Sequence, residues 1–227
     1  MPQFSIITGF LGQTKDRFHV YNTPKSLDEK FAIVADIENT TGVEVVFPYE
    51  ANDADELTGL LQKHRLSLSA VNVNIKGEPE FVAGSLTSPK KAVREKAVQF
   101  IKDAKDFAIA VGAPRVTCCP LADGFEFPFE LDYRRAWKSL ADAIAEAADH
   151  QPQMPLFLEY KPKETRGRCV LNRAADTLVL LNTLRNSSLG VTMDYGHSIY
   201  GGESPAEVVC MLEDSGYDYY VHINDND

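Results

Sequence analysis

The chain of 227 residues has only four cysteines and lacks any long apolar segment. The cysteines, Cys118, Cys119, Cys169 and Cys210, do not have the spacing of a zinc knuckle, and a disulfide between the adjacent pair would be strained. We therefore expect reduced thiols and a cytoplasmic protein. No window contains the ~20 apolar residues that a membrane span needs, and the N-terminus does not have the pattern of an export signal.

Positive charge is also scarce. The sequence has 23 Lys and Arg residues against 33 Asp and Glu residues, which gives a net charge of −10. Nucleic acids and anionic membranes attract proteins with excess cations, so we expect neither as a partner. A small neutral or metal-chelated substrate fits this charge better. With 44% hydrophobic residues, the chain can bury one large core, and we expect a single domain over residues 1–227.

Short apolar runs alternate with helical segments along the whole chain, at roughly 30-residue spacing. The expected strands lie near residues 4–8, 43–47, 66–75, 114–120, 156–159, 189–194 and 218–224. Helix starts are indicated by a capping box from Ser26 to Glu29, by Asp132, and by the Ser88-Pro89 and Ser204-Pro205 pairs. The alternation predicts an α/β fold with parallel strands, best matched by a (β/α)8 TIM barrel whose active site lies at the carboxyl ends of the strands.

Only seven strand and helix units are visible, so we expect the barrel to be C-terminally incomplete. Seven strands would leave two exposed edges, which a longer natural chain or a neighbouring molecule would fill. We also expect a homo-oligomer. Two loops are candidates for substrate contact: residues 76–87, which are long for a connection, and the aromatic segment with Phe125, Phe127 and Phe129. Packing over the barrel rim explains the aromatic segment equally well.

Charged and imidazole side chains follow three successive apolar strands. They are Glu159, Lys161, Glu164 and Arg166 after the first, Asp194 and His197 after the second, and His222, Asp225 and Asp227 after the third. Taken singly, these residues could form ion pairs, loop hydrogen bonds or turns. Because the carboxyl ends of parallel strands meet at one edge, we instead expect them to converge. Mixed oxygen and nitrogen donors suit Mn²⁺, Mg²⁺, Co²⁺ or Zn²⁺.

The run from Glu159 to Gly167, of the form Glu-x-Lys-Pro-x-Glu-x-Arg-Gly, resembles the xylose isomerase-like superfamily of sugar isomerases and epimerases. The segments Asp194-Tyr195-Gly196-His197 and His222-Ile223-Asn224-Asp225 are similar to ligand segments of that superfamily, and the resemblance extends from about residue 80 onward. It implies one or two divalent ions per chain. The first ion would be bound by Glu159, Asp194 and His222, and the second by Glu159, His197, Asp225 and Asp227. No counterpart of the superfamily's early-strand catalytic histidine is present, and the fourth ligand would lie beyond residue 227.

The resemblance implies an aldose-ketose isomerase that works by a metal-assisted hydride shift on a sugar substrate. Lys161, Glu159 and His197 would be catalytic, and Lys161, Glu164, Arg166 and Phe127 would bind the substrate. A second possibility is an epimerase or keto-acid isomerase that transfers a proton. Two more are a nuclease of the apurinic-site endonuclease type and a barrel subunit without catalytic activity. The nuclease is disfavoured by the acidic charge and by Asn72 and Asn74, which stand where early-strand histidines are needed.

Overall fold

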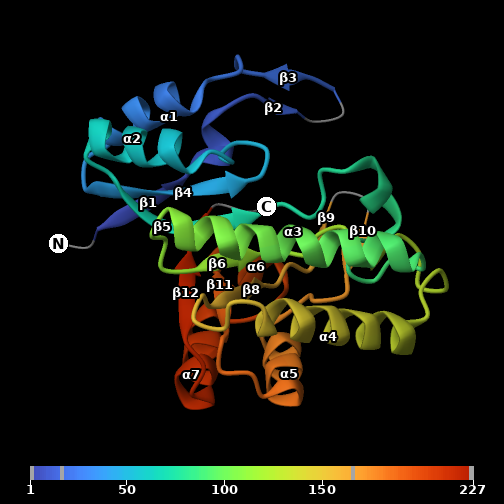
Figure 1. The fold of residues 1–227 in the computed structure, drawn as a ribbon. Coiled ribbons are helices and arrows are strands. Elements are labelled where there is room, and N and C mark those ends of the chain that lie inside the picture. The colour runs from blue at the N-terminus through green and yellow to red at the C-terminus, as the bar shows by residue number, and fades with distance from the viewer. Residues whose placement is uncertain (1–2, 16–17, 165–166, 225–227) are drawn as a thin grey trace.

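A computed structural model describes residues 3–15, 18–164 and 167–224 (Figure 1). Seven parallel strands form one curled sheet in the order β1, β4, β5, β6, β8, β11 and β12. Their bounds are Phe4–Ile7, Thr40–Phe47, Ser67–Val73, Val116–Cys118, Leu156–Glu159, Leu189–Asp194 and Tyr219–His222. Each predicted strand is therefore present, and the curled parallel sheet confirms the TIM-barrel type of fold.

Helices pack on the outer face of this sheet, and α3 and α4 run side by side (Figure 1). The helices are α1 Leu27–Ala35, α2 Ala54–His64, α3 Lys91–Ala110, α4 Tyr133–Asp149, α5 Ala174–Leu184, α6 Tyr195–Tyr200 and α7 Pro205–Ser215, with 3₁₀ turns η1 Thr8–Leu11 and η2 Pro79–Ala83. The predicted capping box of Ser26 and Glu29 begins α1, and Asp132 caps α4. No helix in the described part of the chain combines the length and apolarity needed to cross a membrane.

Successive side chains of each strand point to opposite faces of the sheet. The outer face packs against the helices and is apolar, whereas the inner face, inside the curl, carries polar side chains. On β4, Val43 and Val45 are buried toward the helices, whereas the side chain of Glu44 lies inside the curl of the sheet. Asn72 of β5 and Thr117 of β6 also point inward, because both donate hydrogen bonds to Glu44. The strands thus carry two different surfaces, and the inner one leads to the site at their carboxyl ends.

One predicted helix start is wrong. The pair Ser88-Pro89 predicts the cap of α3, but the helix begins at Lys91 with Lys90 at the N-cap. The three residues before this pair form hydrogen bonds outside the helix: Ser85, Leu86 and Thr87 all donate to the buried carboxylate of Asp123. The carbonyl of Ser88 accepts a hydrogen bond from the Arg94 guanidinium at 2.7 Å, whereas the backbone N–H groups of Val93 and Arg94 bond to the carbonyl of Lys90, which places the N-cap at Lys90.

Several short elements have no counterpart among the predicted ones. Helix α6 follows β11 directly, and β2 Thr14–Lys15 pairs with β3 Val20–Tyr21. A three-stranded sheet also forms from β7 Gly124–Phe125, β10 Gly167–Cys169 and β9 Lys163–Glu164. These elements have two to six residues each, so their sequences show too few periods to be recognised.

The two edge strands of the sheet, β1 and β12, each pair on one side only within the described ranges. A hollow of about 540 Å³ lies between them and is lined from both sides, for example by Phe4 and Val221. Contacts across the interior hold the curl: the hydroxyl of Tyr220 donates to Ser69 Oγ at 3.1 Å, and the Arg115 guanidinium stacks on the Tyr220 ring. The position of the hollow is where a closed barrel would have its eighth strand.

Lys105 on α3 provides a stability test of the helical layer. Its side chain is 0% exposed, and its Nζ donates to the carbonyl oxygens of Ala147 and Ala148 at 3.1 and 3.0 Å. Burial lowers the pKa of Lys105 to about 8. The folded protein therefore releases this proton near pH 8, whereas Lys105 in the unfolded chain keeps it until the pH approaches the ordinary pKa of 10.5.

We expect the wild type to gain stability relative to Lys105→Met as the pH rises from 8 to 10. The gain arises because the cost of burying the ammonium disappears, and it is on the order of 1.4 kcal/mol per pH unit. Urea unfolding of both proteins at pH 7, 8, 9 and 10 measures the difference. A difference that stays constant or shrinks with pH would contradict the depressed pKa.

Candidate metal centre and substrate cavity

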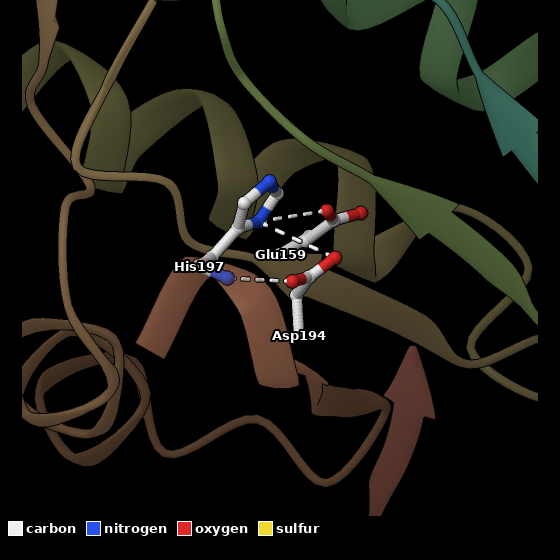
Figure 2. A group of neighbouring side chains, drawn as sticks. All are labelled: Glu159, Asp194 and His197. Carbon is white, nitrogen blue, oxygen red and sulfur yellow. Dashed lines mark hydrogen bonds and ion pairs between the residues drawn. The ribbon is translucent and has the colours of Figure 1, made fainter. Parts of the chain in front are cut away.

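Two adjacent strands end in carboxylates that face one another. β8 ends at Glu159, and β11 ends at Asp194. Asp194 is also the N-cap of α6, where its Oδ1 accepts a hydrogen bond from the backbone N–H of His197 at 2.7 Å. This cap fixes His197 beside Asp194 and Glu159, as Figure 2 shows.

These three side chains form a compact, buried cluster. His197 Nδ1 lies 3.2 Å from Glu159 Oε1 and 3.5 Å from Asp194 Oδ2. One potential ligand atom from each residue lies within 4.8 Å of the others, which is close enough for a single ion. Two carboxylates and an imidazole also form a donor set that suits Mn²⁺, Co²⁺ or Zn²⁺. The residues of the cluster therefore fit a divalent metal.

A second contact of His197 constrains its role. Nδ1 lies 3.0 Å from the backbone oxygen of Tyr160, which can only accept a hydrogen bond. The hydrogen of a neutral imidazole is therefore held on Nδ1, and Nε2 remains as the ring's acceptor. Since Nδ1 is the atom that faces the two carboxylates, His197 is less suited to bind an ion between them than the distances alone indicate.

His222, at the end of β12, approaches the same carboxylate from the other side. Its Nδ1 lies 3.4 Å from Glu159 Oε2, and its Nε2 lies 3.0 Å from Glu44 Oε2. Burial disfavours a charged imidazole, but the bonds to Glu159 and Glu44 outweigh it and raise the pKa of His222 to about 10. Burial likewise opposes ionisation of Glu159, yet His197 and His222 hold its pKa below the usual range.

Asp194 differs from Glu159 in its electrostatics. Burial raises the pKa of Asp194 above that of an ordinary aspartate, despite the nearby His197. Its Oδ2 accepts a hydrogen bond from Asn224 Nδ2 at 2.6 Å. A divalent cation would stabilise both carboxylates in their ionised form, so the clustering of these buried acids is consistent with a cation site.

A cavity of about 370 Å³ opens beside these residues. Its lining includes Glu159, Asp194, His197, His222 and Lys161, together with Lys30, Glu50, Asn72, Asn74 and Lys76. Lys161 Nζ donates to Glu164 Oε1 at 2.8 Å. Partial burial works against the ammonium, but Glu164 raises the pKa of Lys161 above its ordinary value. Lys161 is thus a cation at neutral pH, not an amine base.

Some of the predicted site residues lie away from the cavity. The ring of Phe127 is on the surface with 62% exposure and does not line the central cavity. Glu164 on β9 lines a neighbouring hollow instead. From residues 76–87, one of the two loops expected to contact the substrate, Lys76 alone contributes to the cavity. Arg166, Asp225 and Asp227 lie outside the described residues.

The structure adds three charged residues that the sequence patterns do not single out. Lys30 of α1 pairs with Glu50, which also accepts hydrogen bonds from Thr8 Oγ1 at 2.5 Å and from the backbone N–H of Val46 at 3.1 Å. The third residue is Glu44, whose signal is a single acid at an inward position of an apolar strand. Lys30 and Glu50 have no such signal, because their pairing depends on how α1 packs near the end of β4.

Known proteins share both the sequence pattern and the fold. Residues 31–227 match the family described as xylose isomerase-like TIM barrel. Xylose isomerase of Thermus thermophilus is 26% identical over 170 residues, which cover 73% of this chain and 44% of that protein. The chain thus spans less than half the length of this relative.

Solved structures of two sugar epimerases superimpose on the fold. L-ribulose 3-epimerase gives a TM-score of 0.73 at 18% identity, covering 98% of this chain and 70% of that one. The 3-keto-D-glucoside 4-epimerase YcjR of E. coli gives 0.72 at 16% identity, covering 99% and 80%. Because the family match spans most of the sequence and the curled sheet places the acids at its carboxyl ends, the chain belongs to the xylose isomerase-like TIM barrel family.

Proposed function

We propose that the protein is a divalent-metal-dependent sugar isomerase that interconverts an aldose and a ketose. The observation that carries the proposal is the placement of the Lys161 ammonium in the same cavity as the carboxylates of Glu159 and Asp194. The relatives described above are named for reactions on sugars, either isomerisation or epimerisation. Family membership supports the broader class of sugar isomerases and epimerases. Within that class, the ammonium of Lys161 supports isomerisation.

The side chains suggest a division of roles. Glu159, Asp194 and His222 would hold the ion, with His222 contributing Nδ1, the nitrogen that faces Glu159. The bound ion would act as a Lewis acid and a template for two neighbouring sugar oxygens. His197 Nε2 would accept a hydrogen bond from a substrate hydroxyl, because Nδ1 is held by the Tyr160 carbonyl.

Lys161 would stabilise negative charge that develops on the carbonyl oxygen of the substrate. Its raised pKa keeps the ammonium protonated, so it donates hydrogen bonds and supplies positive charge to this oxygen. A proton-transfer mechanism instead needs a base beside carbon 2. The carboxylate of Glu159 is close to two imidazoles, and that of Glu50 is engaged by Lys30 and Thr8. Both carboxylates are thus already engaged by other side chains, and the ammonium of Lys161 in the same cavity supports hydride transfer between the two carbons.

Isotope retention tests this proposal. Aldoses deuterated at carbon 2 are incubated with the protein and Mn²⁺, Mg²⁺ or Co²⁺, and the products are followed by NMR. We expect the ketose to carry the deuterium at carbon 1, since hydride moves directly between neighbouring carbons. Washout of deuterium into solvent, or inversion at a carbon without formation of a ketose, would instead identify a proton-transferring isomerase or an epimerase.

A nuclease and a non-catalytic subunit have less support in the cavity. A nuclease of the apurinic-site endonuclease type needs histidines from early strands, whereas the cavity residues described from β5 and its following loop are Asn72, Asn74 and Lys76. A subunit without catalytic activity would have no need for buried acids, because burying a charged group costs folding free energy. Metal content per chain distinguishes such a subunit from an enzyme.

A further inference from the structure

Glu44 lies at the centre of a buried hydrogen-bond network within the curl of the sheet. Its side chain is 0% exposed. Oε1 accepts hydrogen bonds from Thr117 Oγ1 at 2.7 Å and from Asn72 Nδ2 at 3.1 Å. Oε2 lies 3.0 Å from Nε2 of His222, which is 178 residues further along the chain. The carboxylate therefore connects β4 to β5, β6 and β12.

These contacts leave Glu44 little freedom to move. A buried carboxylate requires hydrogen-bond donors, and Thr117 and Asn72 supply two of them from neighbouring strands. With Oε1 held in this way, Oε2 is fixed at the position that meets the imidazole. An imidazole that binds a metal through Nδ1 carries its hydrogen on Nε2, and here this hydrogen can be donated to Glu44 Oε2.

The consequence concerns the other nitrogen of His222. Nδ1 is directed toward Glu159, with 3.4 Å between Nδ1 and Oε2. In metal sites, an imidazole that binds through one nitrogen commonly donates a hydrogen bond from the other to a carboxylate, which fixes the ring and strengthens the ligand. The contacts of His222 with Glu44 and Glu159 have this arrangement.

We propose that Glu44 is a positioning residue that holds His222 with Nε2–H turned away from the metal site and Nδ1 presented to it. The proposal rests on the metal site of the proposed function, but not on the identity of the sugar. It assigns a role to an acid that does not line the central cavity. Glu44 would act on metal affinity through the orientation of His222.

Mutation of Glu44 tests the role. Glu44→Gln keeps the size of the side chain but loses the charge, and we expect Mn²⁺ affinity to fall by about 10- to 100-fold, the scale for losing an outer partner of a ligand. Glu95→Gln is the matched control, because it makes the same chemical change in an exposed ion pair with Lys91 on α3. Mn²⁺ binding is measured by electron paramagnetic resonance of the free ion, with thermal unfolding in parallel. The control should bind Mn²⁺ nearly as well as the wild type.

A second measurement needs no variant and so does not depend on whether Glu44→Gln folds. In the Zn²⁺-loaded wild type, long-range ¹H–¹⁵N spectra should show His222 with the hydrogen on Nε2 and the metal on Nδ1. Ligation through Nε2, or wild-type affinity in a folded Glu44→Gln protein, would overturn the proposal. A wild type that binds none of these ions would overturn the metal site itself, which separates failure of the proposed function from failure of this inference.

Discussion

Replacing Glu159 by Gln should remove the metal site. Glu159 lies between His197 and His222, at 3.2 and 3.4 Å from their Nδ1 atoms, so any ion held by this cluster would depend on its charge. We expect Mn²⁺ affinity to fall by more than about 100-fold. This is more than the loss of a residue that only hydrogen-bonds to a metal ligand would cause. Turnover should fall on the order of 10³-fold or more, because substrate orientation and polarisation are lost together. Calorimetric titration and a sugar isomerisation assay measure the two effects.

The matched control is Glu95→Gln on α3. Glu95 forms an exposed i,i+4 pair with Lys91, and such pairs contribute at most about 1 kcal/mol. This variant has the same chemical change and should keep wild-type metal binding and turnover. A Glu159→Gln protein that binds Mn²⁺ as well as Glu95→Gln would show that the ion, if bound, is held elsewhere.

Replacing Lys161 by Met should separate catalysis from metal binding. Lys161 lines the cavity, but its ammonium pairs with Glu164, which is not one of the proposed metal ligands. We expect turnover to fall on the order of 10²-fold or more, the scale for losing one preorganised electrostatic donor. Mn²⁺ affinity should stay at the wild-type level, because no expected ligand has changed. Steady-state kinetics and Mn²⁺ titration are needed on the same preparation.

A control for this variant is Lys138→Met on α4, where an exposed lysine pairs with Asp142. Loss of that pair should leave both turnover and metal binding unchanged. Near-normal turnover in Lys161→Met would show that the Lys161 ammonium is not needed to stabilise negative charge on the carbonyl oxygen of the substrate. That result would favour a proton-transfer mechanism, particularly if deuterium is also lost to solvent.

Local patterns in the sequence are enough to predict the order of the strands and the longer helices. They also identify the candidate ligands at the ends of β8, β11 and β12. Apolar runs and helix caps such as Ser26 with Glu29 involve neighbouring residues, so they can be recognised without the fold. The convergence of Glu159, Asp194 and His222 follows from topology alone, since the ends of neighbouring parallel strands meet at one edge. Helix α6 escapes prediction because it has only six residues, although its N-cap, Asp194, is recognisable as a candidate ligand.

Which atoms of the site face one another is settled only by the tertiary packing. The bond of His197 Nδ1 to the Tyr160 carbonyl and that of His222 Nε2 to Glu44 depend on side-chain orientation, which has no signature in the sequence. The pairing of Glu44 with His222 spans 178 residues and requires the sheet to curl until β4 and β12 face each other across its interior. Patterns along the chain report the local periodicity of one element, whereas these contacts are set by the packing of distant elements.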